Sequence, residues 1–487
     1  MTGLVQFSGN LRTSVQSPWT WGGWLRLVVV TIVFSTADLL GEVYHVGPSR
    51  SHRSISEVPW EDLEAGDRVL IDWQSEPYRD KWVICAEGTE AQPIVVSGVP
   101  GKDGQLPVVS GDQARTRTEL DFWNEDRGVI KLGGASHSPG SIPKFVTIEN
   151  LDIRSARPAY LYHGRKGAKR YRRDAAAIYI EEGHRITIRN CRLSDSGNGL
   201  FANGEKLLVE FCQIEGNGID GSFTEHNVYS AVDDLTFQFN QFGNLREGCA
   251  GNNLKDRSAG LVVRNNWFVG GSRQLDLVDA EDRNGRLVGR ESYRDTFVYG
   301  NVIEEGNAHF RREIVHYGGD SGNDAWYRKG TLHFYHNTVV SRRDGLTVLF
   351  RLSSEDERAE LRSNIFFAAD PRGRLALSHG RGRFRMDRNW LSRGWVKTSR
   401  TLFWGDLEES NSIEGLAPEF VDWNLSDLRI EADHRVEWST EPFWIKDGLD
   451  HPVRYFGESK GVWRSQADPL KVPLGAMWFQ SSSRRLD

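Results

Sequence analysis

The chain has 487 residues, of which 26% are charged, and a formal net charge of −6. This mildly acidic balance offers no basic field for nucleic acid, and the length allows either one elongated domain or about three compact ones. Fifty glycines and only three methionines, with strand-like runs along the sequence, argue against a helical bundle.

Residues 1–41 are predicted to form a signal peptide or an N-terminal anchor. A short apolar run, LRLVVVTIVF at residues 25–34, follows Arg12 and an aromatic stretch and precedes small residues near Ala37 and Gly41. A helix that crosses a membrane needs about 20 apolar residues, whereas a short apolar core behind an arginine is typical of a signal peptide. We therefore expect a secreted or periplasmic protein. No other stretch is apolar enough to span a bilayer.

Residues 42–140 are predicted to form an N-terminal cap and the first coils of a repeat. The segments PWEDLEAGDRVLI, GTEAQPIVVSG and LPVVSGD combine short strand-like runs with Gly and Pro turns. Such a cap is needed because the end turns of a stacked repeat would otherwise expose its core. Residues 396–487, where the repeat pattern fades, are predicted to form further partial coils and a C-terminal cap.

Residues 141–395 carry one recurring pattern: alternating apolar residues, then a small or polar residue, then an apolar residue two positions later. Aligned on that last apolar residue, the copies place these residues in one column: Leu151, Cys191, Cys212, Asn240, Asn266, Asn301, Asn337, Asn364 and Asn389. The intervals between them are 40, 21, 28, 26, 35, 36, 27 and 25 residues. Such intervals match single turns of a parallel β-helix, with insertions at some corners.

The six asparagines of this column predict a ladder of hydrogen bonds. Equivalent positions on successive turns of a parallel β-helix lie about 4.8 Å apart, so stacked side-chain amides can bond to one another. Cys191 and Cys212 fall in the same column on adjacent turns, either as packed thiols or as a disulfide. The alternative fold is a β-propeller, although its blades need four strands each and a more regular period. We predict an all-β chain that folds as a parallel β-helix.

The stretch from Thr224 to Asp282 is predicted to display a polar groove that continues onto the next turn. Strand residues alternate between inward and outward positions. With the aliphatic residues pointing inward, four successive turns would present these polar residues: His226, Asn227 and Tyr229; Asn253, Lys255 and Arg257; Asp276 and Asp279; Glu313 and His316.

These residue types suit β-elimination from a polysaccharide that contains uronic acid. The reaction removes the proton next to the carboxylate and expels the 4-linked sugar. It needs a base, a cation on the substrate carboxylate and an acid for the leaving oxygen. Lys255 could be the base, because a neighbouring cation and partial burial favour a neutral amine, and Arg257 could instead bind the carboxylate. Tyr229 or His226 could supply the acid.

Two further groups complete the predicted site. Three carboxylates on these turns could hold Ca²⁺, which prefers oxygen ligands: Asp276, Asp279 and Glu313. Four polar residues are predicted to bind the substrate: Asn227, Asn253, Arg246 and His316.

The same residues also have structural interpretations. Lys255, Asp256 and Arg257 could form a surface salt-bridge cluster, and His226 could be a structural histidine. Asp276 and Asp279 could cap turns or pair with nearby arginines.

Two other functions stay open at this stage. One is a glycoside hydrolase that uses a pair from Asp256, Asp276 and Asp279, since an inverting hydrolase needs carboxyl groups about 6.5–9.5 Å apart. The other is a non-catalytic module that binds polysaccharide during export.

Several blocks also resemble a known group of proteins. The cap pattern PWEDLEAGDRVLI, followed by coils that bear asparagine, resembles the pectate-lyase-like superfamily of right-handed parallel β-helix proteins. GNGLF, EHNVYS, FGNLREG, GNNLKDRSAGLVVRNNW and RQLDLVDAED are similar to blocks of bacterial β-helix proteins described as polysaccharide-degrading and often associated with exopolysaccharide production. The resemblance runs from about Tyr44 to the C-terminus.

This resemblance implies a secreted or periplasmic enzyme that acts on acidic polysaccharide, and we expect it to be a monomer. Many lyases of the superfamily use a lysine or arginine base with Ca²⁺ nearby, and Lys255 and Arg257 are the positions that match. They lie two residues apart on one strand, whereas some lyase families place the two residues on different turns, so their separate roles stay open.

Overall fold

The computed structural model describes residues 41–138, 140–306, 311–430, 455–459, 462–465 and 474–477. Residues 1–40, which carry most of the predicted signal peptide, lie outside this part. Within it, the helices are short 3-10 turns, and no helix is long and apolar enough to cross a membrane. The predicted all-β class is confirmed.

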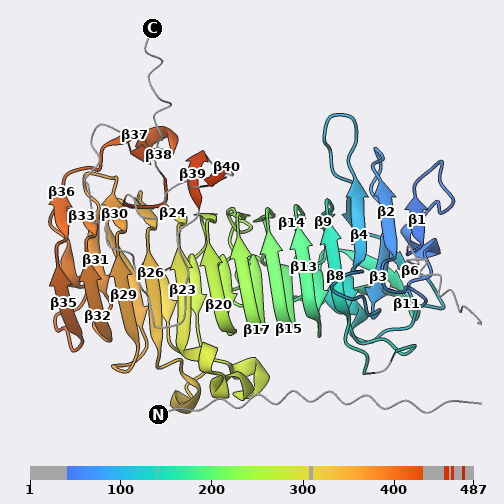
Figure 1. Ribbon diagram of the computed structural model, residues 1–487, viewed down its shortest axis with the longest axis horizontal. Coiled ribbons are helices and arrows are strands. Elements are labelled where there is room, and N and C mark those ends of the chain that lie inside the picture. Colours follow the sequence, from blue (N-terminus) through green and yellow to red (C-terminus); the bar gives the residue numbers. More distant parts are fainter. Residues whose placement is uncertain are drawn as a thin grey trace, which may run out of the picture. The chain divides into compact units, whose positions relative to one another are not determined.

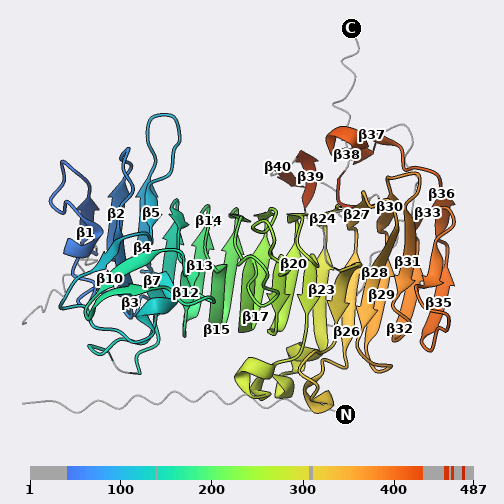
Figure 2. The same ribbon diagram turned by 180° about the vertical axis from the view of Figure 1, so that it is seen from behind.

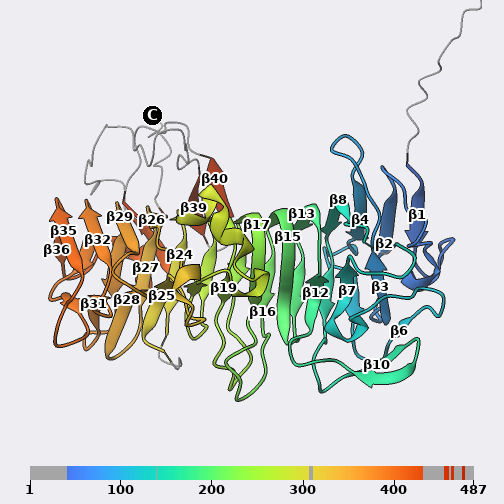
Figure 3. The same ribbon diagram turned by 90° about the horizontal axis from the view of Figure 1, so that it is seen from below.

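The strands form three stacks of parallel strands, and the chain passes through the first, second and third stack once per turn. In Figures 1 and 2 the strands of the second stack lie side by side from β1 to β35. Figure 3 shows the strands of the first stack in the same way, from β7 past β19 to β31. This is the predicted parallel β-helix, and it excludes the β-propeller.

The first stack contains β3 (Asp80–Ile84), β7 (Gly128–Leu132), β12 (Ala176–Ile180), the start of β15 (Asn198–Glu210) and of β17 (Val228–Gln238), β19 (Leu254–Asp256), β22 (Leu275–Leu277), β25 (Glu313–Tyr317), β28 (Leu346–Leu352), β31 (Arg374–Ser378) and β34 (Val396–Thr398). The second stack contains β1 (Val43–Val46), β2 (Arg68–Asp72), β4 (Ile94–Val99), β8 (Lys144–Glu149), β13 (His184–Arg189), the ends of β15 and β17, β20 (Ala259–Arg264), β23 (Asp295–Tyr299), β26 (Thr331–Tyr335), β29 (Arg358–Arg362), β32 (Arg383–Asp387) and β35 (Asp406–Ser410).

The third stack contains β5 (Val108–Ser110), β9 (Asp152–Arg154), β14 (Arg192–Ser194), β16 (Gln213–Glu215), β18 (Gln241–Phe242), β21 (Trp267–Val269), β24 (Val302–Glu305), β27 (Thr338–Ser341), β30 (Ile365–Ala368), β33 (Trp390–Ser392) and β36 (Ile413–Gly415). The remaining short strands are β6 (Ala114–Thr116), β10 (Leu161–Gly164), β11 (Gly167–Arg170), β37 (Phe420–Asp422), β38 (Asp427–Ile430), β39 (Tyr455–Ser459) and β40 (Val462–Ser465). The 3-10 turns are η1 (Ile55–Glu57), η2 (Glu125–Arg127), η3 (Glu281–Arg283), η4 (Arg286–Gly289), η5 (Glu291–Arg294), η6 (Asp324–Trp326) and η7 (Trp423–Leu425).

The core lies inside the three stacks because each strand alternates buried apolar and more exposed side chains. In β20, for example, Leu261 and Val263 are buried, whereas Val262 and Arg264 are half-buried. Residues in register on neighbouring turns therefore form continuous rows, apolar on the inside and largely polar on the outside.

The predicted asparagine ladder is present between the second and third stacks. The Nδ2 of Asn240 donates to the Oδ1 of Asn266 over 3.0 Å, and the Nδ2 of Asn266 donates in turn to the Oδ1 of Asn301 over 3.0 Å. The contact repeats through Asn337, Asn364 and Asn389. A primary amide both donates and accepts hydrogen bonds, so each asparagine side chain can hydrogen-bond to the turn above it and to the turn below it.

A left-handed residue precedes each ladder position and creates the corner. Asn265, for example, has φ 54° and Gly300 has φ 65°. The same conformation precedes the two cysteines of the column, at Asn190 and Phe211. This conformation turns the chain sharply and points the next side chain inward, so each corner needs only two residues.

Cys191 and Cys212 continue the ladder column toward the N-terminus as free, buried thiols. The backbone N–H of Cys191 lies 3.5 Å from the Sγ of Cys212, and the N–H of Cys212 donates to the Oδ1 of Asn240 over 2.9 Å. Of the two possibilities for this pair, packed thiols are the one observed.

Replacing one ladder asparagine will destabilise the protein. Asn301→Ala leaves the backbone carbonyl of Val263 and the N–H of Asn266 without their partners. We expect the free energy of unfolding to fall by about 3 kcal/mol, since each buried polar group left unpaired costs about 1–3 kcal/mol. Urea denaturation measures this change. The control is Asn424→Ala at an exposed position, and an equal loss in both variants would contradict the ladder's role.

Candidate active site

An outward row of the first stack passes through the predicted site. The residues that share this row on consecutive turns are Lys131, Tyr179, Phe201, Tyr229, Lys255, Asp276, His316 and Arg351. The prediction that Tyr229, Lys255 and Asp276 lie on neighbouring turns is therefore confirmed. The row changes from aromatic to charged at Lys255, and this point is the centre of the candidate site.

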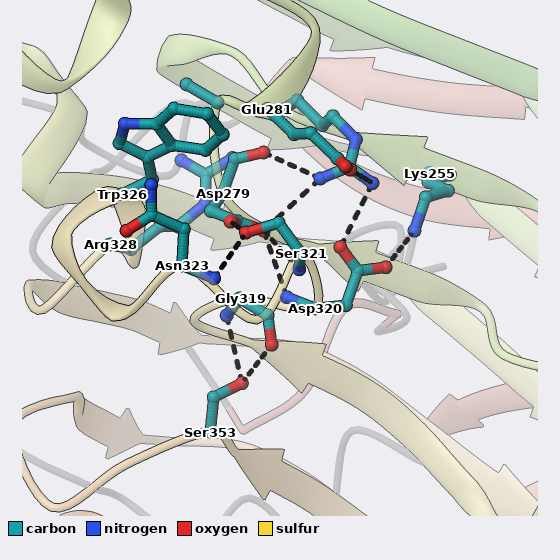
Figure 4. A network of polar contacts seen from close by, with 12 residues as sticks. Lys255, Asp279, Glu281, Gly319, Asp320, Ser321, Asn323, Trp326, Arg328 and Ser353 are labelled. Atoms are coloured by element: carbon teal, nitrogen blue, oxygen red, sulfur yellow. Dashed lines mark hydrogen bonds and ion pairs between the residues drawn. The ribbon is translucent and has the colours of Figure 1, made fainter. Parts of the chain in front are cut away.

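Lys255 and Arg257, two residues apart at β19, share a carboxylate. The Nζ of Lys255 lies 2.5 Å from the Oδ2 of Asp320, and the NH2 of Arg257 lies 3.0 Å from the Oδ1 of the same residue. Figure 4 shows the contact between Asp320 and Lys255. Both cations are largely buried, whereas 32% of the Asp320 side chain is exposed. The site therefore holds one carboxylate by two positive charges near the surface.

Asp276 lies beneath Lys255 with both oxygens fully used. Its Oδ2 accepts from Lys255 and from Asn252, both over 2.9 Å. Its Oδ1 accepts from Arg273 over 3.0 Å and from the Nδ1 of His316 over 2.7 Å. Burial alone would raise the pKa of Asp276, but Lys255, His316 and Arg273 hold it well below the usual range. Asp276 is thus a permanent buried anion that fixes the position of Lys255.

Asp279 anchors the loop that carries Asp320. Its Oδ1 accepts the backbone N–H of Asp320 over 2.9 Å and a contact from the NH1 of Arg257 over 3.2 Å, and its Oδ2 accepts from the hydroxyl of Ser321. Ser353 supports the other side of the loop by contacting both the N–H and the carbonyl of Gly319 (Figure 4). These contacts define the position of Asp320.

Asp320 was missed at the sequence level. It lies in YGGDSGND, a Gly-rich loop after β25, where the alternation of strand residues gives no indication of which side chains face the site. The sequence does contain a signal for Asp320, because its loop directly follows His316, which lies on the turn after Asp276. Burial raises the pKa of Asp320, but Lys255 and Arg257 lower it overall.

The residues predicted to supply an acid, Tyr229 and His226, lie beside the cations. The Nε of Arg257 donates to the hydroxyl of Tyr229 over 2.8 Å, and the rings of Tyr229 and His226 are stacked with centroids 5.8 Å apart. Burial raises the pKa of Tyr229 well above its ordinary value, although Arg257 opposes this. Burial also lowers the pKa of His226 to about 3, assisted by the charge of Lys255. His226 is therefore neutral, and its Nδ1 accepts the N–H of Asn252 over 2.9 Å.

The predicted outward positions of Asn227 and Asn253 are wrong. Both side chains are fully buried, and the Nδ2 of Asn227 donates to the Oδ1 of Asn253 over 2.6 Å. They belong to a second amide ladder that continues through Gln274 to Glu305. Each precedes a first-stack strand at a corner, where the bend suspends the alternation that holds within strands. Neither side chain can reach a substrate in this arrangement.

Two other predicted substrate-binding residues also have structural partners. The side chain of Arg246 contacts Asp195 over 2.5 Å and the carbonyls of Gly216 and Gly218. His316 is buried between Asp276 and the hydroxyl of Ser353, 2.9 Å from its Nε2. It shares the site but positions Asp276 rather than facing solvent.

The three carboxylates predicted to hold Ca²⁺ are each paired with cations. Asp276 and Asp279 are bound as described above, and Glu313 lies 3.6 Å from His379 and 4.0 Å from Arg273. In the described part of the chain, no group of three or more His, Cys, Asp or Glu side chains is arranged to hold a metal ion. The predicted calcium ligands thus have no support from this geometry.

The aspartates considered for hydrolysis are also buried. Asp256 accepts hydrogen bonds from Ser230 and Ser258, and one of its oxygens lies 3.1 Å from Arg328, whose side chain is equally inaccessible. Asp276 and Asp279 are at most 1% exposed. The predicted alternative of a surface salt-bridge cluster fails for the same reason, because this network lies mostly beneath the surface.

Residues 120–339 match the family model described as a right handed beta helix region. The chain is thus an all-β right-handed parallel β-helix, as the sequence indicates. A comparison with curated proteins found no match.

Several solved structures are similar at low identity. The GH136 lacto-N-biosidase from Eubacterium ramulus is 11% identical with TM-score 0.44, covering 77% of this chain and 68% of that chain. The alginate lyase from Paenibacillus sp. str. FPU-7 is 11% identical with TM-score 0.42, covering 66% and 94%. Pectate lyase Pel9A is 11% identical with TM-score 0.35, covering 79% and 84%. At such identities the likeness concerns the fold alone.

Acid will weaken the fold through His226. Its pKa is about 3 in the folded protein, against an ordinary value of 6.5, so below pH 6.5 the unfolded chain binds a proton that the folded one does not. Stability is therefore full above pH 6.5 and declines toward pH 3. We expect His226 to account for about 2 kcal/mol of the loss between pH 7 and pH 5.

Urea denaturation of His226→Gln at both pH values measures this contribution, and the variant should lose that much less stability than the wild type. His137→Gln, at an exposed position, is the control and should behave as the wild type does. An equal loss in His226→Gln and the wild type would show that His226 does not titrate as described.

Proposed function

We propose that this site binds an acidic polysaccharide and cleaves it by β-elimination. The observation that carries the proposal is the carboxylate of Asp320, which bridges Lys255 and Arg257. A uronate carboxylate has the same charge and shape. It can replace Asp320 on the two cations, because Asp320 lies on a loop and is the most exposed member of the trio.

Displacing Asp320 leaves the rest of the network intact. Lys255 keeps Asp276, and Arg257 keeps Asp279 and Glu281. In the proposed reaction Arg257 binds the substrate carboxylate and stabilises the negative charge that develops on it. Lys255, once its ammonium proton has passed to solvent, takes the proton next to that carboxylate as a neutral amine.

Tyr229 is suited to donate a proton to the leaving sugar oxygen. Its hydroxyl is protonated at neutral pH, because burial raises its pKa. The hydrogen bond from Arg257 orients it toward the two cations, and stacking on Phe201 with centroids 4.9 Å apart fixes the ring. Any developing phenolate would be stabilised by the guanidinium.

A glycoside hydrolase is the second candidate, with a different pair of carboxylates from those predicted. Asp320 and Glu281 both lie 3.0 Å from the NH2 of Arg257, and 32% and 46% of their side chains are exposed. Two carboxylates that contact the same nitrogen can approach the distance of about 5–5.5 Å between carboxyl groups that retaining glycosidases use. In this mechanism Asp320 would be essential.

Asp320→Asn separates the two candidates. In a lyase whose substrate displaces Asp320, the variant keeps kcat, and KM falls by up to about fivefold, since a partly exposed ion pair contributes about 1 kcal/mol. The assay follows the ultraviolet absorbance of unsaturated uronate ends on a panel of acidic polysaccharides. New reducing ends without that absorbance, abolished by Asp320→Asn, would establish the hydrolase instead.

Lys255→Ala should lower kcat on an acidic polysaccharide by about 100-fold or more, because a positioned general base contributes that much. The fold should survive, since Asp276 keeps Arg273, His316 and Asn252. Lys397→Ala, at an exposed position on β34, is the matched control.

Unchanged turnover in Lys255→Ala would remove Lys255 from the mechanism. If the wild type cleaves no glycan but binds one, the protein is instead a polysaccharide-binding module, which is the third function considered from the sequence.

A further inference from the structure

A polar cleft lies on the second stack, outside the site described above. Its volume is about 550 Å³, and residues from β23, β26, β29 and β32 line it. We propose that this cleft binds a uronate residue of an acidic polysaccharide and serves as an ancillary binding site. The proposal takes only its ligand class from the proposed function and does not require that the protein be a lyase.

Two arginines in register carry the inference. Arg358 on β29 and Arg383 on β32 are direct neighbours on adjacent turns, and both side chains are exposed. Like charges directly opposite each other on paired strands repel. Neither guanidinium takes part in an ion pair among the described residues, although Asp406 on β35 is in register with Arg383 on the next turn. A bound anion between them would replace this repulsion with two attractions.

The acidic residues that line the cleft either contact other groups or lie in a different row from the two arginines. Asp295 lies 3.0 Å from the Nε2 of His333. Asp356 lies 3.7 Å from Lys329, whose closer partner is Asp324.

Glu360 pairs in register with Arg385, one row away from Arg383. The cleft therefore presents two available guanidinium groups, and each can bind a carboxylate through two parallel hydrogen bonds.

The rest of the lining suits a sugar rather than a bare inorganic anion. His333 is stacked on Phe297 with centroids 4.7 Å apart, and its contact with Asp295 fixes the ring. Thr331 adds a hydroxyl between the Asp295 and Arg358 positions of the same row. These groups can bond to sugar hydroxyls while the arginines hold the carboxylate. The volume is within the range of about 300–1,000 Å³ of small-ligand sites.

The cleft is connected to the candidate active site by one segment of chain. Asp320 lies at one end of the connection between β25 and β26, and Lys329, which lines the cleft, lies at the other. The two sites thus lie on different stacks. An ancillary site here would hold one part of a long polysaccharide while another part reacts at Lys255.

The experiment compares a double variant, Arg358→Gln with Arg383→Gln, against Arg385→Gln. Arg385 is also exposed on β32 but does not line the cleft, so it is a matched control for lost charge. Calorimetric titration with tetragalacturonate measures binding, and a neutral cello-oligosaccharide and inorganic phosphate serve as separate probes. The two arginines are exposed, so the fold should be unaffected.

We expect the wild type and Arg385→Gln to show two tetragalacturonate sites and the double variant to lose one of them, with that site weakened about tenfold or more. Activity on tetragalacturonate should be unchanged in the double variant. Equal binding stoichiometry in all three proteins would overturn the proposal, and so would phosphate binding at the cleft without tetragalacturonate binding. Loss of one binding site in the double variant, together with no turnover by the wild type on any polysaccharide of the panel, would refute the proposed lyase but support the cleft.

Discussion

The in-register stacking of successive turns is the constraint on which the whole structure depends. Neighbouring strands of a sheet lie about 4.8 Å apart, so every side chain has its own equivalent above and below it. Apolar side chains can stack on their equivalents without any further partner. A buried polar row is stable only if its side chains hydrogen-bond to identical side chains on the next turn or pair with an opposite charge there. The asparagine ladder follows the first solution and the row through Lys255 follows the second.

The pairing of opposite charges on neighbouring turns, Lys255 with Asp276, explains why the candidate site is mostly buried and yet stable. Lys255, Asp276 and His316 succeed one another on three turns, and side contacts from Arg273 and Asn252 complete the bonding of the central carboxylate. A buried ion pair is costly unless its remaining hydrogen-bonding groups are satisfied. Here Asp276 accepts four contacts, so its charge is compensated within the first stack. The residues at the rim, Asp320 and Glu281, are the more exposed carboxylates of the network.

The fold was predictable because its strongest signal repeats. One column of asparagines identified the turns, and the structure contains the ladder between the same residues. The neighbourhood of Tyr229, Lys255 and Asp276 also followed from strand alternation. Asn227 and Asn253 were predicted to face outward, but they occupy corners, where alternation does not apply. Asp320 was missed because it comes from a loop, and its position depends on contacts with Asp279 and Ser321 rather than on any periodicity.

The corner between the second and third stacks has a further consequence for how such a chain can change. From Asn240 to Asn389 it is made of two residues on each turn, a left-handed residue and an amide, and its hydrogen bonds leave no room there for extra chain. Connections elsewhere in the turn carry long inserts, among them η3–η5, seen as the yellow-green coil in Figure 1, and the segment that bears Asp320. Lengthening or exchanging these inserts leaves the stacking undisturbed. New specificities can therefore arise on one side of the molecule while the opposite corner preserves its architecture.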